Sequence, residues 1–177
     1  MTSLTGPGHP LRKLFSGLVE QVFQVDIGIC DPLLTDYLGD LLADFIHVDR
    51  IYPLRTANGD VIRDLSRLEA EANLGPAVTE SRRRRFINKY VGDFTLFWTG
   101  VYPENLRAGH QGGVDLLEPY VATGKRSYGI AGELTGDGDE PPANVLLQLS
   151  EQFEFCVHGL HLVRVEWERL SQNDRRN

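Results

Sequence analysis

The stretch PPANVLLQLSEQFEFCVHGLHLVRVEWERLS, residues 141–171, decides the fold. Its apolar residues recur in strict steps of three and four, at Leu146, Leu149, Phe153, Cys156, Leu160, Val163, Trp167 and Leu170. This spacing places an apolar seam along one side of an α-helix. The proline pair at its start is typical of a first helical turn. We therefore predict one long C-terminal helix that ends near Ser171.

The same helix carries apolar residues away from the seam. No residue between Glu154 and Arg164 is charged, and Phe155, Val157 and Leu162 lie outside the seam. A helix that is apolar all round is buried on more than one side. The helix is therefore either central or contributes one face to a subunit interface, most simply that of a C2 homodimer.

Five further segments, all earlier in the sequence, are also predicted to be helices. Their apolar residues recur with helical spacing, in residues 11–23, 31–46, 60–72, 76–99 and 119–135. In the second, Thr35, Gly39 and Ala43 form a column of small residues that favours close approach of another backbone. Gly100 and Pro103 are expected to end the fourth. We predict an all-α, single-domain bundle of about six helices over residues 1–177, with disordered tails at 1–9 and 172–177.

Composition narrows the class of protein. The 177 residues are 41% hydrophobic and 24% charged, which is typical of a globular domain. No apolar run is long enough to cross a membrane, and no secretory signal precedes the first charges. Two cysteines in such a chain are expected to be reduced thiols, with Cys156 in the core and Cys30 more accessible. A cytoplasmic location follows as the expectation.

Charge is unevenly distributed along the chain. The net charge is −7, and residues 14–49 contain seven acids and no Lys or Arg. The basic run Arg82, Arg83, Arg84 and Arg85 follows about forty residues later. It forms a solvated surface, pairs with the acidic column Asp36, Asp40 and Asp44, or binds nucleic acid. The acidic balance of the chain disfavours nucleic acid. A solvated surface is the simplest interpretation, and pairing with the acidic column is the hypothesis that we put forward for test.

One part of the sequence resembles a known family. Gly92-Asp93, Leu96-Phe97, Gly100 and Pro103-Glu104, followed by Tyr120-Val121, Gly124, Ser127-Tyr128 and Ala131, are similar to positions in an uncharacterised family of bacterial helical proteins. The resemblance covers about a quarter of the chain. It implies a helical fold and a bacterial source, and it supplies no activity and no catalytic residue.

The strongest metal-ligand pattern is Glu154, His158 and His161. At i, i+4 and i+7 they share one face of the last helix, where a carboxylate and two imidazoles could ligate Zn or Fe. A fourth ligand could come from Asp44, His47 or Asp49. The simpler interpretation is that both histidines are hydrogen-bonded structural residues, because E-x-x-x-H-x-x-H is not a recognised metal signature. We therefore predict no cofactor and keep a divalent metal as the alternative.

The remaining candidate is the aromatic group Phe94, Phe97, Trp98 and Tyr102, which could line an apolar ligand pocket. No phosphate-binding loop or nucleophile motif is present in the sequence. We expect a non-enzymatic helical protein that self-associates and binds a protein or a small apolar ligand. The alternatives are an acid/base or metal enzyme using the histidines and carboxylates, and a nucleic-acid-associated regulator using Arg82–Arg85.

Overall fold

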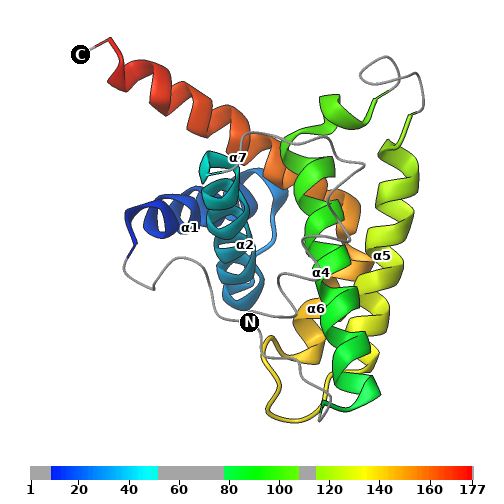
Figure 1. The fold of residues 1–177 in the computed structure, drawn as a ribbon. Helices are drawn as coiled ribbons and strands as arrows, with labels where there is room; N and C mark the ends of the chain where they lie inside the picture. Colours follow the sequence, from blue (N-terminus) through cyan, green and yellow to red (C-terminus); the bar gives the residue numbers. More distant parts are fainter. Residues whose placement is uncertain (1–8, 52–77, 108–114, 177) are drawn as a thin grey trace.

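The computed structural model describes residues 9–51, 78–107 and 115–176, and within them the chain forms six α-helices (Figure 1). They are α1 (Pro10–Val22), α2 (Pro32–Ile51), α4 (Glu80–Val101), α5 (Leu117–Glu133), α6 (Ala143–Glu151) and α7 (Phe153–Asp174). A π-helical turn, η1 (Phe23–Ile27), follows α1, and a 3-10 turn, η2 (Pro103–Leu106), follows α4. The all-α prediction is confirmed. The helix predicted over residues 60–72 lies outside the described residues.

The first two helices pack closely against each other. Asp31 caps α2, because its Oδ1 accepts a hydrogen bond from the backbone N–H of Leu33 at 3.0 Å. Gly39 faces α1, where a Cβ atom would lie 2.9 Å from Ser16 Oγ and 3.0 Å from Ser16 Cα. The small-residue column therefore does admit a neighbouring backbone, and that prediction is confirmed.

Helices α4 and α5 lie side by side and run in opposite directions (Figure 1). α4 begins after Thr79, whose side chain caps it, and therefore later than predicted. It continues through Gly100 and ends at Val101, two residues before Pro103, so of the two predicted helix terminators Pro103 is confirmed and Gly100 was wrong. A Cβ on Gly100 would lie 2.8 Å from Leu160 Cβ, so this glycine lets α7 approach α4 closely.

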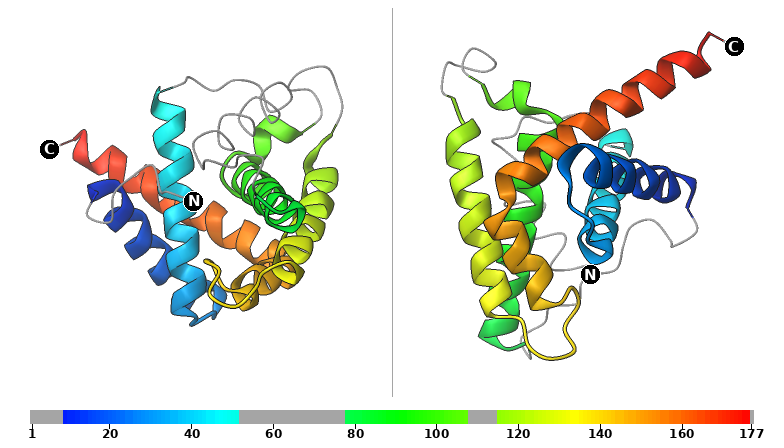
Figure 2. Two further views of the ribbon diagram at one scale, coloured as in Figure 1. Left: turned by 60° about the horizontal axis from the view of Figure 1, so that its bottom comes forward. Right: turned by 180° about the vertical axis from the view of Figure 1, so that it is seen from behind.

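The prediction of a long C-terminal helix is confirmed by α7, which has 22 residues, but that helix begins at Phe153, so the expectation that it starts at the proline pair was wrong. The chain bends at Gln152 (φ −105°, ψ 26°), which separates α6 from α7. The bend keeps the bond from Gln152 N to the Gln148 carbonyl and that from Cys156 N to the Gln152 carbonyl. It lets α6 pack on α5 while α7 runs from α4 to α1 and ends at Asp174 (Figure 2).

The predicted seam is nevertheless the buried side of both helices. Six of its residues are almost completely inaccessible to solvent: Leu146, Leu149, Phe153, Cys156, Leu160 and Val163. Trp167 packs edge-on against Phe15 of α1, with ring centroids 5.3 Å apart. Both sides of the bend therefore contribute to a single core.

The opposite side of α7 faces solvent. Phe155 is 61% exposed and Val165 is 49% exposed, so α7 is not buried all round within one chain. The cysteine prediction is confirmed: Cys156 is buried and Cys30 is exposed. Burial raises the pKa of the Cys156 thiol to about 12.

In the part of the chain that the structure describes, no helix has the length and apolar character needed to cross a membrane. The cytoplasmic location stays a prediction.

Candidate functional site

A buried polar network centres on Asp93, in the half of α4 that is otherwise nearly all apolar. Its carboxylate is paired with Lys89, whose Nζ lies 2.9 Å from Oδ2. The Tyr128 hydroxyl of α5 donates to Oδ1 at 2.7 Å, and the Tyr37 hydroxyl of α2 donates to the same oxygen. Three helices therefore meet at one carboxylate.

The two phenols in this network are held in their protonated form. Burial raises the pKa of Tyr37 and of Tyr128 well above the ordinary value, and the negative charge of Asp93 raises both further. Lys89 Nζ also lies 5.1 Å from the centre of the Tyr37 ring, a cation–π distance. These groups satisfy one another, so the network acts as a fixed polar support between helices.

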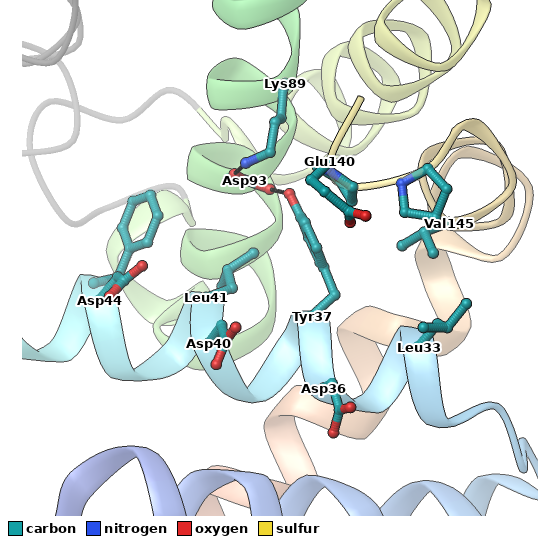
Figure 3. A pocket seen from close by; sticks show the side chains of 13 residues that line it. Leu33, Asp36, Tyr37, Asp40, Leu41, Asp44, Lys89, Asp93, Glu140 and Val145 are labelled. Atoms are coloured by element: carbon teal, nitrogen blue, oxygen red, sulfur yellow. Dashed lines mark hydrogen bonds and ion pairs between the residues drawn. The ribbon is translucent and has the colours of Figure 1, made fainter. Parts of the chain in front are cut away.

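A pocket of about 310 Å³ opens beside this network, between α2, α4 and the segment that leads into α6 (Figure 3). Tyr37, Lys89 and Asp93 contribute to its lining from the polar network. Its apolar lining consists of Leu33, Leu41, Phe45, Pro141, Pro142 and Val145. Four more acidic residues complete the lining, namely Asp36, Asp40, Asp44 and Glu140. A mixed lining of this size is typical of a small-molecule site.

The acidic column of α2 lines the pocket, and Arg12 of α1 pairs with it. Arg12 Nη1 lies 2.8 Å from Asp40 Oδ1, and Nη2 lies 3.5 Å from Asp44 Oδ1. Burial raises the pKa of Asp40, Arg12 opposes that effect, and the charges of Asp44 and Asp36 raise it further. The column is thus compensated in part from α1.

Within the arginine run, the structure shows side-chain hydrogen bonds for Arg85. Arg85 donates from Nε to Thr135 Oγ1 at 2.8 Å and from Nη2 to the Pro141 carbonyl at 3.0 Å. Arg85 therefore holds the segment between α5 and α6 against α4. For Asp40 and Asp44 the structure shows Arg12 of α1 as an ion-pair partner, because α1 packs along α2, and pairing of the column with Arg82–Arg85 stays a prediction.

The structure does not bring the histidine pattern together as a metal site. His158 and His161 are exposed on α7, and Glu154 binds Lys125 Nζ at 2.8 Å. Across residues 9–51, 78–107 and 115–176, no three His, Cys, Asp or Glu side chains are grouped so that they could hold a metal ion. Two of the suggested fourth ligands, His47 and Asp49, have side chains outside what the structure describes.

The predicted aromatic pocket is a packed part of the core. Phe94, Phe97 and Trp98 are buried, and the ring centroids of Phe97 and Trp98 lie 5.8 Å apart. Tyr102 packs edge-on against Phe97 at 5.7 Å. The pocket described above is lined by other residues, and it meets this aromatic group where Phe45 stacks on Phe97 at 5.0 Å.

Sequence reasoning did not identify Tyr37, Lys89, Asp93 or Tyr128 as parts of a site. One signal was present: Lys89 and Asp93 lie four residues apart, and Asp93 directly precedes an apolar run. A charge pair with helical i, i+4 spacing at the entry to a buried segment indicates a buried ion pair. The tyrosine partners had no comparable local signal.

Comparisons with protein-family models, with curated proteins and with solved structures found no match. They identify no family for this chain, and the resemblance drawn from the sequence stays a prediction.

Proposed function

We propose that this is a non-enzymatic helical binding protein, and that the pocket between α2, α4 and α6 holds a small ligand with an apolar body. One observation carries the proposal: the pocket combines apolar walls from α2 and α6 with fixed polar groups at Asp93 and Tyr37. Apolar walls supply the driving force for binding, and a few fixed polar groups supply orientation.

The protonation states support binding over catalysis. Tyr37 and Tyr128 have pKa values raised well above the ordinary one, so neither supplies a phenolate at neutral pH. Asp93 accepts hydrogen bonds from both phenols and pairs with Lys89, which leaves it poorly placed to accept a proton from a substrate. General acid–base catalysis needs a group with an accessible proton position and a pKa near the working pH.

A pocket-filling substitution tests this proposal. Leu33 lines the pocket and is 53% exposed, so Leu33→Trp can place an indole in the pocket without disturbing the core. The matched control is Leu14→Trp, at another exposed leucine outside the pocket lining. We expect apolar fragments to bind the wild-type and Leu14→Trp proteins, and to lose binding in Leu33→Trp, as followed by ligand-observed NMR. Equal binding by all three proteins would reject the pocket as the site.

Self-association through α7 is a second proposal, supported by the exposure of Phe155 and Val165. In an antiparallel two-fold pairing centred on residue 160, Phe155 of one copy lies opposite Val165 of the other, and His158 lies opposite Leu162. A two-fold interface uses the same patch on both copies, as this face would. The partner in this proposal is a second copy of the chain.

Light scattering tests the second proposal. We expect a particle of twice 19.9 kDa at micromolar concentration. Phe155→Ser should convert it to a monomer, whereas Val25→Ser, at a more exposed apolar residue on η1, should leave the dimer intact. A wild-type monomer of 19.9 kDa would reject self-association.

A further inference from the structure

Part of the pocket wall lies outside the helices. It comes from residues 134–142, which join α5 to α6, and it includes Pro141 and Pro142. The middle of this segment is a turn that bonds to itself: the Gly136 N–H donates to Asp139 Oδ2 at 2.9 Å, and the Asp139 N–H donates to the Gly136 carbonyl at 3.2 Å. These local bonds shape the turn, but they do not fix its distance from α2 and α4.

Arg85 of α4 supplies two bonds between that helix and the segment. Its Nε donates to Thr135 Oγ1 at 2.8 Å, and its Nη2 donates to the Pro141 carbonyl at 3.0 Å. The guanidinium group is planar and its donors have fixed directions, so one side chain holds both acceptors in a defined geometry. The two bonds therefore determine where Pro141, a residue of the pocket wall, lies relative to α4.

Arg85 lies on the pocket side of α4, although it is not one of the residues that line the pocket. Lys89 and Asp93, which do line it, follow at intervals of four residues, so the three share one side of the helix. Burial is the largest cause of the raised pKa of Tyr37, and the positive charge of Arg85 opposes that rise. Arg85 is therefore close to the polar network and can act on a ligand through the wall that it holds.

We infer that Arg85 is a positioning residue of this pocket, and that it sets the width of the space that receives the apolar body of the ligand. This inference rests on the proposed binding function. With both bonds in place, Pro141 and Pro142 stay at one distance from α4, so the segment need not become ordered on binding. Without them the wall can move outward, and a slim ligand then loses contacts that a wider ligand keeps.

Two alcohols of different width test this inference: hexan-1-ol, which is a slim chain, and cyclohexylmethanol, which carries a wider ring. Calorimetric titration of the full chain gives the affinity for each. Arg85→Met should weaken hexan-1-ol about threefold to tenfold and cyclohexylmethanol by less than about twofold. If Arg85 only stabilised the fold, both affinities would change by the same factor.

Matched variants show whether Arg85 acts through the segment. Thr135→Val removes one acceptor of Arg85, and it should shift the ratio of the two affinities in the same direction as Arg85→Met, by a smaller factor. Thr135→Ser keeps the acceptor and should behave like the wild-type protein. Arg84→Met removes an equal charge at the exposed neighbouring position and should alter neither affinity.

Amide hydrogen exchange of the ligand-free protein provides a second readout. The Asp139 N–H bonds within the turn, and the Val145 N–H bonds to the Pro142 carbonyl at 3.1 Å. Both amides should exchange faster in Arg85→Met than in Arg84→Met, because the segment opens more often once it is released from α4. Equal exchange in the two variants would overturn the inference.

The possible failures are distinguishable. If Arg85→Met weakens both alcohols equally, or if Thr135→Val leaves their ratio unchanged, the inference is overturned while the binding function stands. The same holds if Arg84→Met shifts the ratio as Arg85→Met does, because charge and not the two hydrogen bonds is then responsible. If neither alcohol and no apolar fragment binds the wild-type protein, the inference and the proposed function both fail.

Discussion

At the scale of single residues, Asp93 has the largest structural role in the site. Its side chain is 5% exposed and that of Lys89 is 10% exposed, so the ion pair between them is buried. Removing one member of a buried pair leaves the other charge without compensation. The stability of the protein should therefore depend far more on this pair than on any exposed pair.

Asp93→Asn should lower the free energy of unfolding by about 3 kcal/mol, because it leaves the Lys89 ammonium buried and unpaired. Urea unfolding followed by circular dichroism measures the change. The control is Glu154→Gln, which breaks the exposed pair with Lys125 and should cost less than about 1 kcal/mol. Similar losses in the two variants would show that the Asp93 network is not the polar support described above.

The tyrosines of the network predict a pH dependence. The pKa of Tyr37 and that of Tyr128 are raised above 10.0, so the folded protein keeps phenol protons that the unfolded chain releases near that pH. The free energy of unfolding should therefore fall as the pH rises above about 10. In an ultraviolet phenolate titration, these two tyrosines should ionise only as the protein unfolds. The Tyr37→Phe, Tyr128→Phe double variant should lose that delayed phase, and its persistence would contradict the assignment.

The environment of a single residue could be predicted from the sequence where it depends on spacing within one helix. The seam position of Cys156 predicted its burial correctly. The Asp93 network was missed because its tyrosines lie 56 and 35 residues away along the chain. Only the packing of α2 and α5 on α4 brings them together, and no spacing within one helix encodes that packing.

At the scale of elements, glycines govern how closely the helices pack. Gly39 of α2 faces Ser16 of α1 at a distance that excludes a side chain. Gly17 is the next residue along α1, and nothing lies within 4 Å of the place where its Cβ would be. An alanine at Gly17 therefore tests helix propensity alone, whereas an alanine at Gly39 also tests how closely α1 and α2 pack.

Gly39→Ala should destabilise the protein by about 1–3 kcal/mol, because the new methyl group meets the backbone and side chain of Ser16. Gly17→Ala should stabilise it by about 0.5–1 kcal/mol, because alanine is the better helix former and space is free. Thermal and urea unfolding of both variants provide the measurement. Stabilisation by Gly39→Ala would show that α1 and α2 do not pack as described.

The positions of the helices could be predicted from the sequence to within a few residues. The points at which a helix is interrupted or continues could not be predicted. The seam of residues 146–163 identified the buried side of α6 and α7 correctly, but its unbroken periodicity gave no sign of the bend at Gln152. Gly100 was misinterpreted for a related reason. Glycine ends helices and also admits close neighbours, and only the presence of Leu160 of α7 decides between these roles.

At the scale of the whole molecule, the site depends on which helices become neighbours. The acidic column was recognised from its spacing, and so was its need for cationic partners. The prediction named Arg82–Arg85 as those partners because it relied on the density of charge along the sequence, and it did not consider Arg12. The packing of α1 on α2 places a single arginine beside Asp40 and Asp44.

The central claim is that ligands bind in the pocket between α2, α4 and α6. Amide chemical-shift mapping of the isotope-labelled chain, titrated with the small apolar alcohol hexan-1-ol, tests it most directly. We predict that perturbations concentrate on residues 33–45 of α2 and on residues 140–145. Perturbations that instead concentrate on residues 155–165 of α7, or that spread evenly over the chain, would contradict the claim.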